Sequence, residues 1–367
     1  MTDPRIVNLA NLLVNYSVAV KPGDWVLVRA GVEALPLARE VARFVLRAGG
    51  NPTPLFDDQD LQKVILDESS EAQLDWVSPV ETMLFDQADV LINLVSAANT
   101  HALSGVDPRK MSRRQVARRR LIETYMRRAA EGSLRWTLTQ FPCQALAQDA
   151  DMSLAEYEDF VYSATFADQI DPIAAWQKVR DEQERLVRWL DGRQQVVVRG
   201  PNSELSLSIK GRRFINCCGD RNMPDGEIFT GPVEESVNGW VRFTYPAIHS
   251  GREVEDVELR FKDGKVVEAS AAKNQEFLLA MLDSDPGARF LGEFAIGTNF
   301  GIRRFTKSIL FDEKIGGSFH MAVGAGYPET GSCNKSAIHW DFICDMRDDS
   351  EILVDGELFY KNGQFVV

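Results

Sequence analysis

Two of the four histidines of this 367-residue chain lie among acidic and glycine-rich segments near its C-terminal end. His339 and Asp341 are separated by one residue. Side chains at positions i and i+2 of an extended strand point to the same face, so both can reach one divalent cation. His320 lies in a segment, residues 316–326, whose glycines let the backbone approach closely around a side chain. The pattern predicts a metal site with imidazole and carboxylate ligands.

Glutamates in apolar or turn-rich surroundings extend this set. Glu227 directly follows a Pro-Asp-Gly turn. Such a turn holds the side chain in one place, whereas a glutamate on a solvated helix face is free to move. Glu293 interrupts an apolar stretch, residues 291–297, that is typical of a buried strand. A lone carboxylate there is costly unless it is paired or binds a cation. An ion pair with Arg289 or Arg303 is the alternative explanation for Glu293.

Several ordered segments resemble the aminopeptidase T family of dinuclear metallopeptidases. They comprise residues 223–232, 291–293, 310–313 with His320, and 339–341, and residues 12–24 and 152–161 extend the similarity over nearly the whole chain. The resemblance implies two divalent ions per chain, bridged by Glu293. The ligands that it implies are Glu227, Glu293, Glu313, His320, His339 and Asp341. It also implies a catalytic Tyr327, peptide substrates and a homodimer.

The residue types themselves suit hydrolysis. Oxygen and nitrogen ligands without thiolate favour zinc, cobalt or manganese, and two ions about 3.5–4 Å apart can share a water and lower its pKa. Glu313 or Glu227 can carry a proton to the leaving amine, and Tyr327 can donate a hydrogen bond to the oxyanion. The predicted function is therefore a metallo-aminopeptidase, a hydrolase that removes N-terminal residues from peptides.

Two other functions compete with this interpretation. His320, His339 and Asp341 alone form a two-histidine, one-carboxylate set that suits a mononuclear non-haem iron dioxygenase, and a dihydroxypyridine dioxygenase resembles the same family. The surplus glutamates favour the peptidase, because one iron does not need them. A non-catalytic binding or assembly protein is the remaining class, and it would leave the whole ligand set without a purpose.

Composition bounds the class of protein. A net charge of −13 argues against nucleic-acid binding, and no apolar run approaches a membrane span. The nine basic residues between positions 109 and 128 are expected to form a solvated helix face. Five cysteines without metal-finger spacing, and no secretory leader, favour reduced thiols and a cytoplasmic protein. Cys333 lies in a segment near the expected site, where packing is the preferred explanation.

The two halves of the chain predict different architectures. In residues 1–191, apolar strands at 25–29, 90–95 and 134–139 alternate with helical patterns, which predicts an α/β domain with a mostly parallel sheet. No glycine-rich fingerprint follows the first strand, so nucleotide binding is rejected. Residues 192–367 contain predicted hairpins at 195–209, 257–267 and 360–365, which indicates a β-rich α+β catalytic domain with the metal ligands. The junction is expected after a helix that ends near Gly192.

Apolar residues next to the expected ligands bear on substrate preference. Phe294, Phe319, Met321 and Trp340 flank the expected ligands in the sequence. These side chains motivate the hypothesis of an apolar pocket with a preference for leucine-like N-terminal residues.

Overall fold

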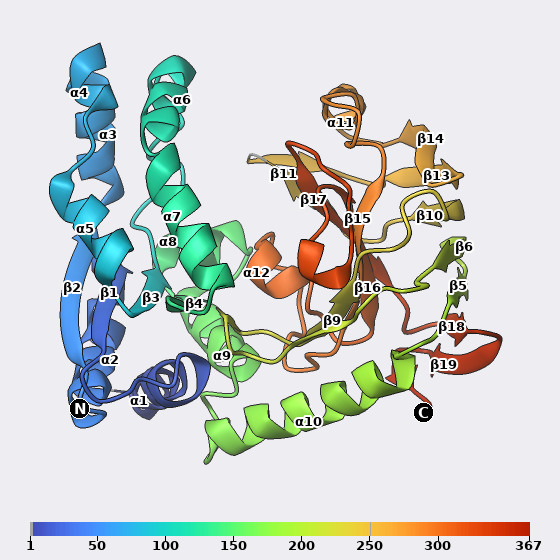
Figure 1. The fold of residues 1–367 in the computed structure, drawn as a ribbon, viewed down its shortest axis with the longest axis horizontal. Coiled ribbons are helices and arrows are strands. Elements are labelled where there is room, and N and C mark those ends of the chain that lie inside the picture. The colour runs from blue at the N-terminus through green and yellow to red at the C-terminus, as the bar shows by residue number, and fades with distance from the viewer. Residues whose placement is uncertain (1–2, 250) are drawn as a thin grey trace. The chain divides into compact units, whose positions relative to one another are not determined.

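The structure, a computed structural model, describes residues 3–249 and 251–367. The chain divides into two compact units, one formed by Met1–Ile173 with Gly219–Pro224 and the other by Ala174–Cys218 with Asp225–Val367 (Figure 1). This division assigns nearly all of helix α10 (Pro172–Leu190) to the second unit, although we expected the junction between residues 191 and 192. The physical reason is that Leu186 and Leu190 of α10 pack into the hydrophobic core of the second unit.

The first unit is built on a parallel sheet, as predicted. Every strand pairing in this sheet is parallel within the described residues. In spatial order its strands are β2 (Asn51–Asp57), β1 (Trp25–Gly31), β3 (Val90–Val95), β4 (Arg135–Gln140) and β8 (Asn222–Met223). Val26, Val28, Val90 and Ile92 are buried, which explains why the central strands read as apolar runs.

Strand β2 is absent from the sequence-based prediction. It contains Pro52 and Pro54, which cannot donate backbone hydrogen bonds and so argue against a central strand. In the structure β2 pairs only with β1, at the edge of the sheet, where one side of the strand needs no donors. The edge position reconciles the two prolines with a strand.

Some helices of the first unit begin at capping residues that are visible in the sequence. A capping box formed by Ser153 and Glu156 begins α9. The helices are α1 (Pro4–Asn11), the π-helix η1 (Leu12–Ser17), α2 (Leu35–Arg47), α3 (Gln59–Glu68), α4 (Glu71–Asp75), α5 (Pro79–Gln87), α6 (Pro108–Ala117), α7 (Arg119–Ala130), α8 (Gln144–Asp149) and α9 (Leu154–Ala164).

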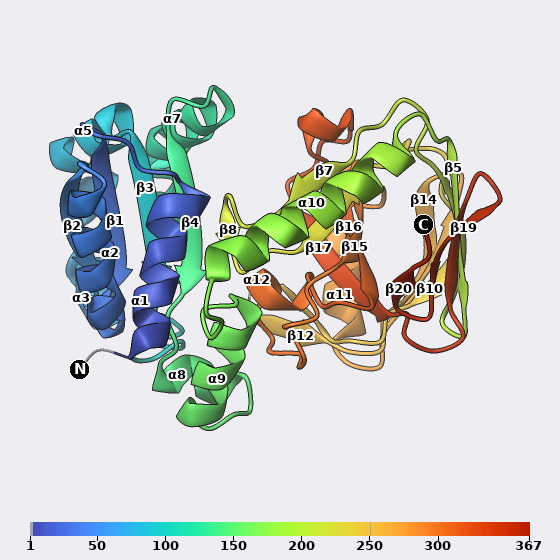
Figure 2. The ribbon, with the colours of Figure 1, turned by 90° about the horizontal axis from the view of Figure 1, so that it is seen from below.

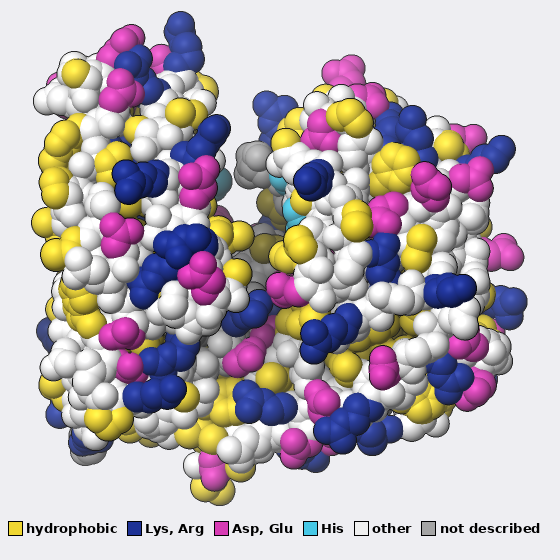
Figure 3. Space-filling view, viewed as in Figure 1, with side chains coloured by type: hydrophobic (Ala, Val, Ile, Leu, Met, Phe, Trp, Pro, Cys, Tyr) yellow, Lys and Arg dark blue, Asp and Glu magenta, His cyan; other side chains and the backbone are white. Residues whose placement is uncertain are grey.

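The basic segment, residues 109–128, forms most of α6 and α7. Some of its arginines pair with acidic residues, such as Arg113 with Asp75 at 2.6 Å and Arg118 with Glu81 at 2.7 Å. Figure 3 shows Lys and Arg side chains interspersed with Asp and Glu side chains over this part of the surface. Most of the segment is therefore a solvated, charge-paired helix surface, as expected, whereas Arg128 is buried and donates to the carbonyl oxygens of Phe85 and Ser133.

The second unit is rich in antiparallel strands, as predicted. Its larger sheet has the order β14 (Lys265–Ser270), β13 (Glu258–Lys262), β10 (Asn238–Arg242), β6 (Ser203–Ser208), β5 (Gln195–Gly200), β18 (Glu351–Val354), β19 (Glu357–Lys361) and β20 (Gln364–Phe365). The three predicted hairpins are the pairs β5 and β6, β13 and β14, and β19 and β20.

A second antiparallel sheet of this unit contains the predicted metal ligands. Its order is β17 (His339–Asp345), β16 (Ser318–Gly324), β15 (Leu291–Gly297), β9 (Glu227–Thr230) and β7 (Ile215–Cys217). The remaining elements are the hairpin β11 (Ala247–His249) and β12 (Arg252–Val254), the helices α11 (Gln275–Leu282) and α12 (Ile309–Asp312), and the short 3-10 helix η3 (Pro328–Thr330). A large hydrophobic core packs between these elements.

Helix α10 lies along the ligand-bearing sheet (Figure 2). Its Gln183 is buried, and the side-chain amide donates to the carbonyl oxygens of Cys217 at 2.9 Å and Glu227 at 3.2 Å. The amide oxygen accepts a hydrogen bond from the hydroxyl of Thr298 at 2.6 Å. Gln183 thus ties the helix to β7, to β9 and to the end of β15. Within the described residues, none of the helices combines the length and apolar character that crossing a membrane requires.

Candidate metal centre

Four neighbouring strands place the predicted ligands on one face of the sheet. Residues directly opposite each other in antiparallel strands share a face. Asp341 of β17 lies opposite Ala322 of β16, and Ala322 lies opposite Glu293 of β15. His339 is two residues from Asp341, His320 is two residues from Ala322, and Glu227 of β9 lies opposite Gly297 of β15. The strand alternation that we inferred for His339 and Asp341 therefore extends across the sheet.

A β-bulge decides the face on which Glu293 lies. Leu291 pairs with Val323, but Glu293 pairs with Ala322, so β15 has one extra residue, Gly292, at this point. In a regular ladder Glu293 would lie opposite Met321, whose side chain is in the hydrophobic core. The bulge re-aims Glu293 toward the histidines, which is a common use of bulges beside functional sites.

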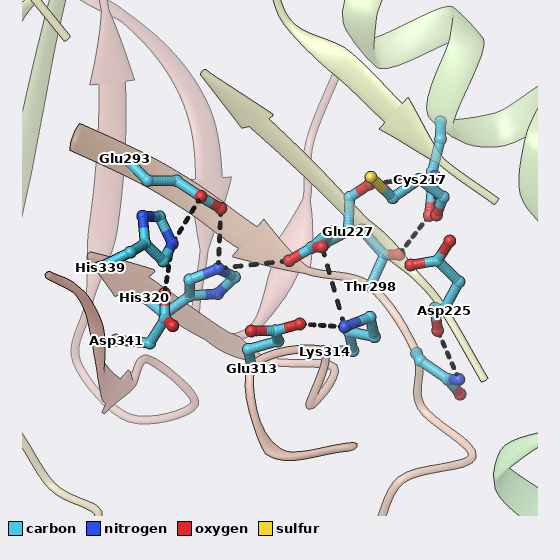
Figure 4. A network of polar contacts seen from close by, with 12 residues as sticks. Cys217, Asp225, Glu227, Glu293, Thr298, Glu313, Lys314, His320, His339 and Asp341 are labelled. Carbon is cyan, nitrogen blue, oxygen red and sulfur yellow. Dashed lines mark hydrogen bonds and ion pairs between the residues drawn. The ribbon is translucent and has the colours of Figure 1, made fainter. Parts of the chain in front are cut away.

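The ligand candidates converge within hydrogen-bonding or near-contact distances (Figure 4). One carboxylate oxygen of Glu293 lies 3.3 Å from Nε2 of His320, and the other lies 3.4 Å from Nε2 of His339. His320 Nε2 is also 3.2 Å from Oε2 of Glu227, and His339 Nε2 is 3.6 Å from Oδ1 of Asp341. Glu293 is thus the residue shared by two groups of ligand atoms: Glu227, Glu293 and His320, and Glu293, His339 and Asp341.

The environment of Glu293 excludes the alternative of an ion pair with Arg289. The guanidinium of Arg289 instead donates to Asp283 at 2.7 Å. The partners of Glu293 are the two histidines.

The orientation of His339 is fixed by the backbone. Its Nδ1 lies 2.7 Å from the carbonyl oxygen of Ala325, and because a carbonyl can only accept, Nδ1 carries the hydrogen. In the neutral imidazole, which is the form that binds metals, the lone pair of Nε2 is then directed into the cluster. Such a hydrogen bond is the usual means by which proteins orient a metal-binding imidazole.

Glu313 lies at the edge of this cluster. One of its carboxylate oxygens can join ligand atoms of His320 and Asp341 in a third group, and the carboxylate contacts the ammonium of Lys314. Lys314 also lies 3.9 Å from Oε1 of Glu227. No pattern in the sequence singled out Lys314, although the charged run of residues 312–314 lies one residue before two glycines.

Three further residues lie beside the site but were not expected there from the sequence: Cys217, Asp225 and Gln183. Cys217 and Asp225 offer ligand atoms within 4.8 Å of one another and of Glu227, and Gln183 supports the backbone of Glu227 from behind. Neither Cys217 nor Gln183 belongs to a motif of recognisable spacing. Cys333, by contrast, is exposed, and its amide donates to Glu234.

Tyr327 lies at the outer side of the cluster. Its ring packs edge-on against His339, with ring centroids 5.2 Å apart, and against Phe229 at 5.3 Å. Glu234 anchors the following loop by accepting hydrogen bonds from the amide of Cys333 at 2.7 Å and the hydroxyl of Ser332 at 3.3 Å, and it pairs with Arg212. The tyrosine is thus held beside the histidine by stacking and by a braced loop.

The electrostatics of the cluster favour positive charge. Burial acts to lower the pKa of His339, but the carboxylates of Asp341 and Glu293 outweigh it and raise this pKa to about 12. The same opposition raises the pKa of His320 to about 9. Burial raises the pKa of Glu227 and of Glu313, whereas at Glu293 hydrogen bonds from the histidines outweigh burial and lower the pKa. These shifts reflect an excess of buried carboxylates, whose charge a bound cation would stabilise.

The flanking aromatic side chains do not form the predicted apolar pocket. Phe294, Phe319, Met321 and Trp340 alternate with the ligands along their strands, so they lie on the opposite face, buried in the hydrophobic core. The hypothesis of a leucine-like preference loses the residues that motivated it. Phe229 and Tyr327 are instead the aromatic side chains beside the ligands.

The donor atoms fit divalent cations. Nδ1 of His320 is buried and has no hydrogen-bond partner among the described residues, and Oε2 of Glu227 and Oδ1 of Asp341 are buried with only the histidine contacts given above. Unsatisfied buried polar atoms are costly, and bound metal ions satisfy such atoms. Nitrogen and oxygen donors at this density suit zinc, cobalt or manganese.

The sequence profile of the thermophilic metalloprotease (M29) family matches residues 2–365. The chain belongs to the M29 family. Aminopeptidase T of Thermus thermophilus is 30% identical over 403 aligned positions, which cover 98% of this chain and 95% of the relative. Aminopeptidase 2 of Geobacillus stearothermophilus is 28% identical, with 96% and 94% covered.

Solved structures agree with this M29 assignment. Wild-type AmpT from Thermus thermophilus superposes with a TM-score of 0.86 and 26% identity, over 99% of each chain. The predicted family, the predicted fold class and the predicted enzyme class are confirmed: the chain is a metal-dependent aminopeptidase, a hydrolase. A 2,5-dihydroxypyridine dioxygenase from Pseudomonas putida superposes with a TM-score of 0.58 at 14% identity, which shows a shared fold and no more.

Proposed function

We propose that this M29 enzyme removes N-terminal residues from peptides at a dinuclear metal centre in which Glu293 bridges the two ions. The observation that carries the proposal is the division of the Glu293 carboxylate, whose two oxygens face different histidines. Glu227 and His320 would complete the deeper subsite, and His339 with Asp341 the outer one.

The exposure of the side chains supports this distinction between a deep and an outer subsite. The His320 side chain is 0% exposed and that of Glu227 is 8% exposed, whereas that of His339 is 27% exposed. Tyr327 is more exposed still, at 43%. A peptide would therefore approach from the side of Tyr327 and His339, and it would meet the outer subsite first.

The residues around the two subsites can divide the chemistry. Bound divalent ions supply Lewis acidity and a water of lowered pKa. Burial raises the pKa of Glu313, which suits this carboxyl to carry a proton to the leaving amine. The Tyr327 hydroxyl, whose pKa is raised by burial and by the charge of Glu293, stays protonated and can donate a hydrogen bond to the oxyanion.

Glu313 has a second possible role as a sixth ligand, because its carboxylate can join His320 and Asp341. Its contact with Lys314 favours the proton-transfer role. We therefore propose Glu227, Glu293, His320, His339 and Asp341 as the main ligands, and Glu313 and Tyr327 as the catalytic residues.

Metal content and hydrolysis measured on one sample test the proposal. We expect about two equivalents of zinc, cobalt or manganese per chain by elemental mass spectrometry, as in a two-metal site. The same sample should release the amine from an aminoacyl amide. One equivalent of iron without hydrolysis would instead favour the mononuclear dioxygenase and overturn the dinuclear centre.

We also propose that the enzyme is a cytoplasmic homodimer. All five cysteines are free thiols, which suits a reducing compartment.

Large apolar side chains stay exposed on the helices of the first unit, a feature typical of association surfaces. They include Leu61, Val64, Trp76, Val80, Met83, Val116, Ile122 and Met126. Sedimentation equilibrium should give the mass of two chains, and a single-chain mass at micromolar concentration would contradict the dimer.

A further inference from the structure

Lys314 is a fully buried ammonium beside the candidate ligands. Its side chain is 0% exposed, contacts the carboxylate of Glu313 and lies 3.9 Å from Oε1 of Glu227. A buried lysine is rare, because desolvation of its charge is costly unless carboxylates compensate it. Two acidic side chains of the site therefore compensate the charge of one buried ammonium.

The backbone fixes the place of this ammonium. The amide of Lys314 donates to the carbonyl oxygen of Phe311 at 3.0 Å, and the carbonyl of Lys314 accepts from the amide of Asn299 at 3.1 Å. These bonds join the residue both to α12 and to the segment that follows β15. The side chain is thereby directed toward the glutamates.

Glu227 separates Lys314 from the histidines. Its Oε1 faces Lys314, and its Oε2 faces His320 at 3.2 Å. Figure 4 shows Lys314 between Glu313 and Glu227, with Glu293 on the far side of His320. The ammonium thus lies on the side of the cluster opposite the bridging carboxylate.

If the proposed function with its two ions is correct, Lys314 is needed to balance the charge of the centre. Asp225, Glu227, Glu293, Glu313 and Asp341 bring five negative charges into the cluster and its border. Two divalent cations neutralise four of them. Lys314 supplies the fifth positive charge, so that no further cation is needed to neutralise these carboxylates.

We propose that Lys314 is a positioning residue that holds the carboxylate of Glu313 out of the ligand shell of the metal ions and so keeps it available for proton transfer. Without the ammonium, Glu313 would be free to join His320 and Asp341 around a metal ion. The oxygen of a carboxylate that coordinates a metal ion has a lone pair occupied by that ion, so it is less free to accept a proton from water or to reach the leaving amine. Lys314 therefore lowers the affinity for metal ions but keeps Glu313 free for proton transfer.

The test is the zinc affinity of the full-length Lys314→Met variant, measured by competition with a chromophoric chelator. Loss of a neighbouring positive charge and gain of a carboxylate ligand should tighten zinc binding by about tenfold or more. Loss of the proton carrier should lower kcat by about 10²-fold with little change in KM. A lysine with a merely structural role would weaken zinc binding when replaced, or leave it unchanged.

Matched variants separate charge from packing. Lys314→Arg keeps the positive charge, so its zinc affinity should stay within about threefold of the parent. Lys361→Met removes an exposed lysine on β19 and should change neither the zinc affinity nor kcat. In the double variant Lys314→Met with Glu313→Gln, most of the gain in zinc affinity should disappear. Equal or weaker zinc binding by folded Lys314→Met would overturn the proposal.

Glu313→Gln provides a test that does not depend on the folding of Lys314→Met. If Lys314 keeps Glu313 out of the ligand shell, this variant should bind zinc within about threefold of the parent but lose about 10²-fold in kcat. A loss of zinc affinity of tenfold or more would show that Glu313 is a ligand and would overturn the proposal. Fewer than two zinc equivalents in the parent would instead refute the dinuclear centre itself.

Discussion

Glu293 joins the two histidines of the centre, and its replacement separates metal binding from folding. In Glu293→Gln the side chain keeps its size but loses the charge that both ions would share. We expect at most one metal equivalent per chain and a loss of at least about 10²-fold in kcat/KM. The near-ultraviolet circular dichroism should match the parent. Glu276→Gln, which alters an exposed residue of α11, is the control. An active Glu293→Gln variant with two equivalents would remove Glu293 from the site.

Tyr327 offers the second prediction at the scale of single residues. Tyr327→Phe keeps the ring that packs on His339 and Phe229 but removes the hydroxyl. Loss of one oxyanion donor should lower kcat by about 10²–10³-fold. Metal content and KM should change little, because the ligands are untouched. A variant that also loses metal would indicate that the hydroxyl is a ligand and not an oxyanion donor.

Strand β15 holds its carboxylate on the site face through one glycine. A Cβ on Gly292 would lie 2.1 Å from the carbonyl oxygen of Ala325, so Gly292→Ala must displace the bulge. We expect a loss of about 1–3 kcal/mol in the free energy of unfolding. Displacement of Glu293 by about 1 Å should also lower kcat/KM by about 10²-fold.

Urea unfolding and steady-state kinetics measure both effects. Gly105→Ala is the matched control, because a Cβ at Gly105 would meet no heavy atom within 4 Å. Unchanged kinetics in a destabilised Gly292→Ala variant would mean that the bulge does not position Glu293.

The loop that carries Tyr327 gives a prediction about pH. Burial acts to raise the pKa of Glu234, but hydrogen bonds from the Cys333 amide and the charge of Arg212 outweigh it and lower this pKa. A lowered folded-state pKa contributes stability that is fully present above the ordinary value of 4.5 and is lost as the pH falls through the folded-state pKa. Hydrogen exchange of the Cys333 amide, corrected for intrinsic rates, should therefore be constant from pH 8 to about 5 and accelerate below about 4.5.

Glu234→Gln tests this brace directly. The variant lacks the charged acceptor, so the Cys333 amide should lose about tenfold in protection at pH 7, and the acceleration in acid should disappear. Glu235→Gln changes the exposed neighbour and should behave like the parent. If both variants retain the parent's response to acid, another group controls the loop.

At the scale of the whole molecule, metal binding and stability are coupled in one unit only. Every proposed ligand belongs to the second unit. At free zinc of about 100 times Kd, binding to the folded state alone stabilises by about 2.7 kcal/mol, or about 5–10 °C in Tm for a unit of this size. Chelation should lower the transition of the second unit by that amount and leave that of the first unit unchanged. Calorimetry with and without chelator measures this, and equal shifts of all transitions would contradict it.

Many local features could be predicted from the sequence. The apolar runs of β1, β3 and β4, the capping box at Ser153 and the hairpin turns follow from short-range periodicity and turn chemistry, which act within a few residues. Strand β2 was missed because its prolines are acceptable only at a sheet edge, and edge position is a property of the tertiary fold.

The sequence by itself also determined which chemistry the second unit can perform, because residue types limit the possible ligands. His339 and Asp341 were expected on one face because the period of a strand is local. The tertiary structure decided the rest: the bulge that turns Glu293 toward the histidines, the partners of Lys314 and the burial of Phe294 and Trp340 in the core. Strand register and the proximity of charges distant in the chain arise only when the strands pair, and no local pattern encodes them.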